Sequence, residues 1–365
     1  MVGYEINEKY FEDEARCGFV VSSLMKRCWA AQLKVLEDFD RVCSKHGLKW
    51  YAFCGTLLGA VRHKGIIPWD DDIDICMLRG DYNMFLNYAK KEMPGYLLEN
   101  YDTYTPEEKR YYNFQGITRI NNTYTADFNP DYLKSHYGFP YTVGIDLYPL
   151  DYVPANYEEY KMAATIFGYT IRTGYKYKSI HWPEYERPDV EFESIDLDEA
   201  YKAIYNATGV KINKNGDILR QLNDIAINVS SYTKSKDSDQ VACMMHTVFG
   251  ERPLIFPKSA FRNRMEVPFE TGSIYIPGDS NAVLSVNYGP DYMTPNTHVP
   301  HDYPYYKQQE RWVRDYVIRN PKMAQYMPAY YIADVYDEAP DKKILLDKVY
   351  GVTITSDLGG SQSES

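Results

Sequence analysis

Two neighbouring stretches decide the fold and the chemistry of this chain: GTLLGAVR at residues 55–62 and PWDDDIDICM at residues 68–77. In the second stretch, apolar residues alternate with acidic ones, which predicts a strand with one apolar face and one largely acidic face. Because residues i and i+2 of a strand point the same way, Asp72 and Asp74 present two carboxylates to one side. Charges about 5 Å apart in an effective dielectric near 20 repel by about 3 kcal/mol. A divalent cation would remove that cost, and all-oxygen ligation favours Mg²⁺ or Mn²⁺ over zinc.

Other interpretations of the acidic stretch remain open. As an EF-hand, Asp70, Asp72 and Asp74 fit positions one, three and five, but Ile75 stands at position six, where the turn requires Gly. A solvated acidic turn would leave the apolar residues of the same stretch without a core. A sugar-nucleotide glycosyltransferase with a DxD motif would use the same carboxylates to hold its donor through a metal.

The preceding stretch indicates a phosphate site. A Gly55-Thr56 pair at a strand-to-helix junction offers free backbone N–H groups and a hydroxyl where an anion can sit. Arg62 and Lys64 add positive charge nearby. Placed before a carboxylate-bearing strand, this arrangement predicts a nucleotide phosphate held between a helix N-terminus and a metal.

Outward from these stretches, periodicity and stop signals predict further elements. We expect helices at 22–46, 57–62, 81–91 and 281–288, strands at 48–54, 73–77, 143–150 and 274–276, and a mostly helical insertion at 157–243. Pro149 is expected to interrupt its strand, since proline cannot donate to a sheet.

Composition bounds the function. A formal net charge of −11 argues against nucleic-acid binding through a basic surface. Six unpatterned cysteines favour a reducing cytoplasm, and the acidic N-terminus does not have the form of a signal peptide. No apolar run is long enough to span a bilayer, so membrane contact is expected to be peripheral, at the inner face of the cell membrane. The 37 tyrosines would allow an aromatic cage for a quaternary ammonium group.

These motifs together resemble the LicD family, the phosphocholine transferases of bacterial surface glycans, whose signature is shared by fukutin-related ribitol-phosphate transferases. The resemblance rests on the two stretches above and on shorter blocks between about residues 46 and 307, at 119–123, 144–151, 268–270 and 288–293.

The resemblance implies an α/β (α+β) fold, with a nucleotidyltransferase-type mixed sheet flanked by helices, a helical insertion and a helical N-terminal segment. The expected organisation is a helical segment at 1–46, a catalytic domain at 47–307 containing the 157–243 insertion, a helical extension at 308–358 and a disordered tail at 359–365. Asp72 and Asp74 would hold the metal. Asp146 matches the third carboxylate of the family and would complete the metal site or act as general base; capping a turn before Pro149 is its alternative role.

The implied reaction transfers a phospho-alcohol or phospho-amine such as phosphocholine from a CDP-linked donor to a hydroxyl of a glycan or glycolipid acceptor, releasing CMP. Gly55 and Thr56 would cradle phosphate, and Arg62, Lys64 and Arg119 are candidates to neutralise the diphosphate. His298 and His301, in a Pro- and Tyr-rich loop, are candidates to approach it.

Two other functional classes share these features. A nucleotidyltransferase that adds NMP to a small molecule would use the same Gly-Thr and Asp-x-Asp elements and would release pyrophosphate. A glycan-binding scaffold that had lost catalysis could keep the fold, but the presence of all three carboxylates argues against it.

Overall fold

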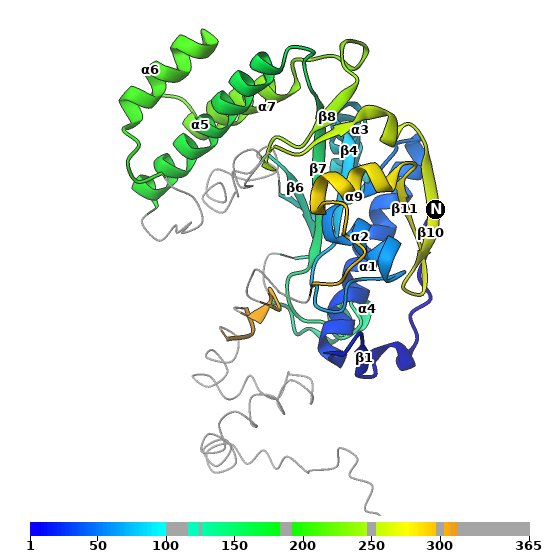
Figure 1. Cartoon of the computed structure of the whole chain (residues 1–365). Coiled ribbons are helices and arrows are strands. Elements are labelled where there is room, and N and C mark those ends of the chain that lie inside the picture. The colour runs from blue at the N-terminus through cyan, green and yellow to red at the C-terminus, as the bar shows by residue number, and fades with distance from the viewer. Residues whose placement is uncertain are drawn as a thin grey trace, which may run out of the picture.

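The computed structural model describes seven segments of the chain: residues 1–99, 116–123, 126–182, 192–246, 253–296, 303–307 and 309–311. Its centre is a seven-stranded sheet in which β3, β4, β7, β6 and β5 lie in that order, while β8 pairs with β7 and β9 pairs with β8 (Figure 1). The strands are β3 Tyr51–Ala52, β4 Asp74–Leu78, β5 Leu97–Glu99, β6 Thr118–Asn121, β7 Gly144–Tyr152, β8 Gln240–Ala242 and β9 Ile255–Pro257. Strands β4 and β7 run parallel and the other pairs are antiparallel, so the sheet is mixed.

Strand β7 is the longest strand and joins both halves of the sheet. It continues through Pro149, so the expected interruption is wrong. The backbone N–H of Asp146 bonds to the carbonyl of Ile73 in the stretch leading into β4, and alternation turns the position of Pro149 to the opposite side. On that side of β7, the pairing with β6 stops at Leu147 and the pairing with β8 starts only at Asp151. Proline therefore stands where the sheet requires no donor.

Helix α1, Ser23–His46, covers this sheet and confirms the predicted first helix. The Ser22 hydroxyl accepts a hydrogen bond from the Met25 N–H at its start, and Gly47 ends it in the left-handed conformation that glycine tolerates best. Its apolar side, which includes Trp29 and Phe39, joins the principal core together with β3, β4 and β7.

Shorter elements surround the sheet. The helices are α2 Cys54–Arg62, α3 Arg79–Glu92, α4 Pro130–Ser135 and α9 Ser280–Tyr288. The hairpins are β1 Glu14–Arg16 with β2 Phe19–Val21, and β10 Arg264–Phe269 with β11 Gly272–Pro277. Helices α2 and α9 contact each other, although more than 200 residues separate them in the sequence.

A second apolar core lies in the region 157–243. Helices α5 Tyr157–His181, α6 Leu197–Thr208 and α7 Ile218–Ser231 pack around it and form a lobe apart from α1 and α2 (Figure 1). After this lobe the chain returns to the main sheet as β8. The helical part therefore ends earlier than expected, and the last residues of the predicted insertion are sheet.

The predicted mixed sheet flanked by helices is confirmed, and its assignment to the nucleotidyltransferase type stays a prediction. Two expectations need correction. The strand expected at 48–54 is reduced to β3, because α2 begins at Cys54 rather than at Leu57. The N-terminal 46 residues contain the β1–β2 hairpin before α1 and are not wholly helical. Most of 308–358 and all of 359–365 lie outside the described residues. Within the described segments, no helix has the length and apolar character needed to cross a bilayer.

Candidate functional site

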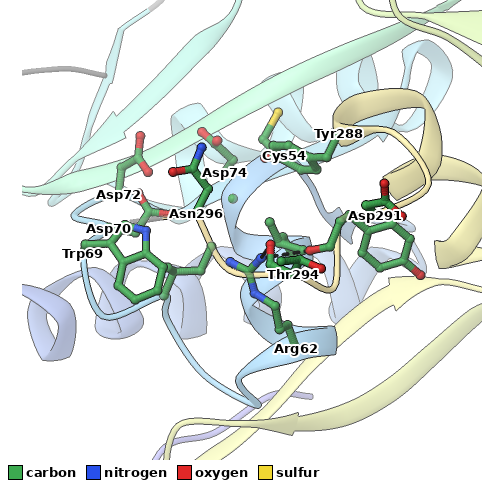
Figure 2. Close-up of a pocket in the computed structure, with 14 residues that line it drawn as sticks. Cys54, Arg62, Trp69, Asp70, Asp72, Asp74, Tyr288, Asp291, Thr294 and Asn296 are labelled. Carbon is green, nitrogen blue, oxygen red and sulfur yellow. Dashed lines mark hydrogen bonds between the residues drawn. The ribbon is translucent and has the colours of Figure 1, made fainter. Parts of the chain in front are cut away.

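The acidic stretch and the first residues of α2 line one cavity of about 520 Å³. Its walls come from the start of α2, the loop leading to β4, and the end of α9 with the residues that follow it. Figure 2 shows these side chains, which include Cys54, Gly55, Arg62, Trp69, Asp70, Asp72, Asp74, Tyr288, Asp291, Tyr292, Thr294 and Asn296.

The start of α2 is fitted closely to the acidic stretch. A Cβ at position 55 would lie 2.4 Å from an Asp70 carboxylate oxygen, so only glycine lets that carboxylate approach the first turn of the helix. Cys54 holds a positive φ of 42°, a strained conformation for a residue with a side chain. The Thr56 hydroxyl accepts a hydrogen bond of 2.8 Å from the Asp74 N–H and is buried. Thr56 thus ties α2 to β4 and does not line the cavity, while its phosphate contact stays a prediction.

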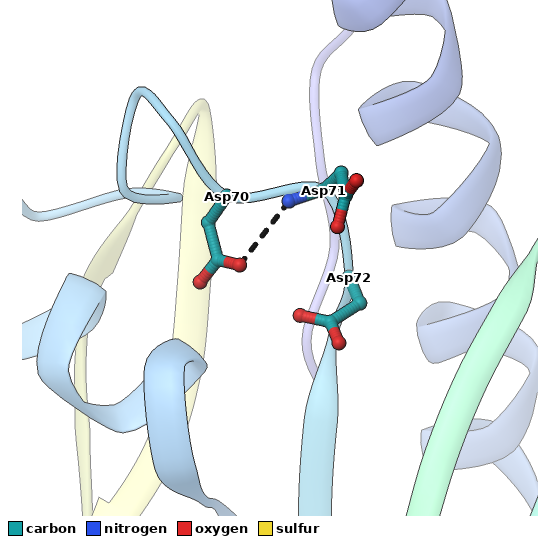
Figure 3. Close-up of side chains that lie close together, drawn as sticks. All are labelled: Asp70, Asp71 and Asp72. Atoms are coloured by element: carbon teal, nitrogen blue, oxygen red, sulfur yellow. Dashed lines mark hydrogen bonds between the residues drawn. The ribbon is translucent and has the colours of Figure 1, made fainter. Parts of the chain in front are cut away.

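Three consecutive carboxylates lie close together, and the first and third of them, Asp70 and Asp72, line the cavity. Asp70, Asp71 and Asp72 each offer an oxygen, and these oxygens lie within 4.8 Å of one another (Figure 3). Helix α1 fixes the backbone that carries them. The indole N–H of Trp29 donates to the Asp70 carbonyl at 3.1 Å, and the Gln32 side-chain amide donates to the Asp71 carbonyl at 2.9 Å.

Asp74 is the most deeply buried of the cavity carboxylates. Its side chain is 7% exposed, and its Oδ1 has no hydrogen-bond partner in the described part of the chain. Burial, reinforced by the charges of Asp72, Asp146 and Asp70, raises the pKa of Asp74 well above its usual range. Burial and the neighbouring Asp72 and Asp71 charges likewise raise the pKa of Asp70. The site therefore holds more negative charge than its own residues compensate.

Asp146 lies beside Asp74. The two residues are direct partners in the parallel β4–β7 pair, so neighbouring strands present their side chains to the same face. Arg119 of β6 is the partner of Asp146 on the other side, and its Nε donates to both carboxylate oxygens at 3.0 and 3.2 Å. The Asp146 charge raises the pKa of Arg119, which stays cationic. The topology thus brings together the three carboxylates expected from sequence and pairs Arg119 with one of them.

The remaining predicted residues divide into two groups. Arg62 lines the cavity, where its Nη1 donates to the Tyr292 carbonyl at 2.8 Å and its Nε donates to His63. Lys64 is exposed and does not line the cavity, because a positive φ of 56° turns the chain at that residue just after α2 ends. His298 and His301 lie outside the described residues.

Sequence reasoning assigned no role to several cavity residues. Tyr288 ends α9, and burial, together with Cys54 and the acidic residues, raises the pKa of its hydroxyl, which stays protonated. Asp291 and Asn296 follow it in the loop, and Trp69 lines the opposite wall. Tyr288 and Asp291 stand in a block that carries the family resemblance, but the sequence does not show that α9 packs on α2.

The residues present fit a hard divalent cation. Carboxylate oxygens are the ligands such ions prefer, and an orphaned, buried Asp74 oxygen beside two other carboxylates is a group that a cation would satisfy. The closest trio by distance, at residues 70–72, differs from the predicted set of Asp72, Asp74 and Asp146, with Asp72 common to both. The ligand set stays a prediction.

Comparisons with known proteins find similarity in the part of the chain that carries the carboxylates of the site. The sequence profile described as "LicD/FKTN/FKRP, nucleotidyltransferase domain" matches residues 47–203. The chain is 34% identical over 95 residues to the lipopolysaccharide cholinephosphotransferase LicD of Haemophilus influenzae, covering 26% of this chain and 30% of that protein. It is 46% identical over 48 residues to an uncharacterized protein of Rickettsia prowazekii, covering 13% of this chain and 18% of that one. The chain thus spans less than a third of the length of either relative.

Proposed function

We propose that this chain, whose residues 47–203 match the LicD family profile, is a divalent-cation-dependent phosphotransferase. It moves a phosphocholine-like group from a CDP-linked donor to a hydroxyl of a glycan or glycolipid. The observation that carries the proposal is the group of carboxylates around the cavity: Asp72 and Asp74 line it, and Asp146 is the direct strand partner of Asp74. The buried Oδ1 of Asp74 has no hydrogen-bond partner among the described residues. The partial match to a cholinephosphotransferase supports the group transferred.

Different residues around the cavity are suited to bind different chemical groups of such a donor. The N-terminus of α2 and Arg62 offer positive potential for a diphosphate. Trp69, Tyr288 and Tyr292 line the same cavity, and aromatic faces attract a quaternary ammonium group. Asp72, Asp74 and Asp146 would hold Mg²⁺ or Mn²⁺, which when bound neutralises charge on the diphosphate and on the leaving CMP.

The chain's own groups have defined tasks in the transfer. The acceptor hydroxyl oxygen bonds to the phosphorus that carries the choline group, and the bond from that phosphorus to the CMP oxygen breaks. Asp146 takes the hydroxyl proton, and Arg119 orients its carboxylate through the two hydrogen bonds from Nε. The main contribution of the protein is to position the two substrates.

The proposal is tested by phosphorus-31 NMR of the protein incubated with CDP-choline, Mg²⁺ and lipopolysaccharide. We expect the diphosphate signals to be replaced by those of CMP and of a phosphodiester, and we expect no change with EDTA or with Asp74→Asn. Asp237→Asn, at an exposed aspartate outside the cavity, is the matched control and should behave as the wild type. Consumption of UDP-glucose in place of CDP-choline would assign the site to a glycosyltransferase, and release of pyrophosphate from a nucleoside triphosphate would assign it to a nucleotidyltransferase.

A further inference from the structure

A second cavity, of about 380 Å³, adjoins the first across Asp72, which lines both. We call it the Gln32 cavity. Besides Asp72, its walls include Gln32 of α1, Glu99 of β5, Arg119 and Asn121 of β6, and Asp146 of β7. A ligand in this cavity would meet a ligand in the first one at Asp72.

Gln32 has an unmet hydrogen-bonding capacity. Its side chain is 1% exposed, and its Nε2 donates to the Asp71 carbonyl. Its Oε1 is buried and has no partner among the described residues. Leaving a buried acceptor unpaired costs free energy, and Gln32 lines this cavity, so its amide oxygen marks a place where a ligand donor or a water belongs.

The charges of the Gln32 cavity select against an anion. Asp71, Asp72, Glu99 and Asp146 line it, and its cation, Arg119, already bonds to Asp146. Phosphate or a diphosphate would be repelled here, whereas hydroxyl groups can donate to carboxylate and amide oxygens. The cavity also lacks the set of aromatic walls that the first cavity offers to a quaternary ammonium, since Tyr305 is its one aromatic lining residue among those described.

From these observations we propose that the Gln32 cavity binds a neutral, hydroxyl-bearing sugar ring of the acceptor, with Gln32 Oε1 accepting a hydrogen bond from one of its hydroxyls. This inference rests on the proposed function and names the acceptor class for the same site. Gln32 and the neighbouring lining residue Gln309 both lie outside the 47–203 match. Acceptor choice is thus set in part by chain segments that flank the family domain.

The test measures binding of methyl glycosides of glucose, galactose and N-acetylglucosamine by saturation-transfer NMR in the wild type, Gln32→Met and Gln240→Met. Gln240 is exposed on β8 and serves as the matched control. Loss of one hydrogen-bond acceptor should weaken sugar binding in Gln32→Met about tenfold. Gln240→Met should bind sugar and CDP-choline as the wild type does.

A series of deoxy-glycosides on the wild-type protein keeps the test decisive if Gln32→Met does not fold. Removal of one particular hydroxyl should weaken binding as much as the substitution does. Equal binding of all deoxy forms, absence of any sugar signal in the wild type, or a Gln32-dependent signal from choline or inorganic phosphate instead of sugar would overturn the inference. Gln32-dependent sugar binding without CDP-choline binding would support the sugar site and contradict the proposed donor.

Discussion

At the scale of a single residue, substitution of Asp74 gives the clearest test of the acidic site. Asp74→Asn removes a proposed metal ligand, and losing several kcal/mol of transition-state stabilisation should lower the transfer rate roughly 10³-fold. The same substitution removes a buried charge whose Oδ1 has no described donor, so the free energy of unfolding in EDTA should stay the same or rise at neutral pH. Rate assays and chemical denaturation measure the two effects. Wild-type turnover by the variant at saturating Mg²⁺ would contradict the assignment.

The raised pKa of Asp74 also predicts how that stability difference depends on pH. In the folded state the carboxyl keeps its proton at pH values where the unfolded chain has lost it, so the native state binds more protons and stability falls as pH rises. The free energy of unfolding of Asp74→Asn should exceed that of the wild type by an amount that depends on pH. This difference should be absent below the unfolded pKa of about 3.9 and should grow as pH rises through the raised pKa of the folded state. Denaturation in EDTA at a series of pH values measures it, and an advantage that did not change with pH would contradict the burial argument.

His246, which contacts Cys54 at 3.9 Å behind the α2 turn, titrates in the opposite sense. Burial lowers its pKa from 6.5 to about 4, so the unfolded chain binds more protons between these values and stability is lost as pH falls through them. His246 should contribute up to about 3 kcal/mol of this loss. The dependence should flatten in His246→Gln and persist in His181→Gln, at an exposed histidine of α5. An identical pH profile in all three proteins would show that His246 is not buried in its neutral form.

The acidic residues of the site were easier to predict from the sequence than the groups that hydrogen-bond to them. Asp72 and Asp74 were identified because two carboxylates on one strand face repel unless a cation compensates them, and Asp146 was identified from the family resemblance. The hydrogen bond from the Asp74 N–H to Thr56 was not predictable, since it depends on how closely α2 approaches β4. The exposure of Lys64 follows from a left-handed backbone conformation that sequence spacing does not reveal.

At the scale of elements, Glu270 holds the loop between α2 and the acidic stretch. It lies in the β10–β11 turn, its side chain is 1% exposed, and its carboxylate accepts from both Nη atoms of Arg16, from the Tyr10 hydroxyl and from the Ile66 N–H. The Lys64 carbonyl accepts from the Glu270 N–H. One side chain thus connects the N-terminal segment to the loop that precedes Asp70.

Glu270→Gln should lower the free energy of unfolding by about 3 kcal/mol, because Arg16 loses a buried, hydrogen-bonded charge partner. Below the melting temperature it should also weaken Mg²⁺-dependent CDP-choline binding, since the loop carries the acidic stretch. Denaturant unfolding and calorimetric titration measure the two effects. Glu266→Gln, at an exposed position of β10, is the control. A loss no larger than that of the control would show that Glu270 does not anchor the loop.

Elements with strong end signals were predicted to within a few residues, and those set by tertiary pairing were not. Helix α1 has a capping serine and a terminal glycine, and both act as expected. Strand β7 passes through Pro149 because β6 and β8 leave a gap there, a fact of topology that local sequence does not contain. The short strands β5, β6 and β9 likewise depend on their neighbours in the sheet.

The whole molecule contains two apolar cores, and the candidate site belongs to one of them. Leu222 of α7 lies fully buried in the core of the helical lobe, whereas Leu36 of α1 lies fully buried in the principal core. Leu222→Ala should lower the free energy of unfolding by about 2–5 kcal/mol and leave CDP-choline affinity unchanged at temperatures where the protein stays folded. Leu36→Ala should lower both, because α1 carries Trp29 and Gln32. Calorimetry measures stability and affinity, and equal loss of affinity in both variants would show that the lobe takes part in donor binding.

The division into two cores was anticipated only in part. Polar islands and helical periodicity indicated a separate helical region, but the return of the chain to the main sheet at β8 required long-range pairing that no local pattern shows. The contact between α9 and α2 is also a long-range contact that no local pattern shows. For this reason the sequence did not place Tyr288 and Asp291 in the site.

The most direct test of the central claim, that the carboxylates of this cavity hold a divalent cation together with a CDP-linked donor, is calorimetric titration of CDP-choline into the protein with Mg²⁺ and again with EDTA. The proposed function predicts binding that requires Mg²⁺ in the wild type and is lost in Asp74→Asn. Equal affinity in Mg²⁺ and in EDTA, or wild-type affinity in Asp74→Asn, would contradict it.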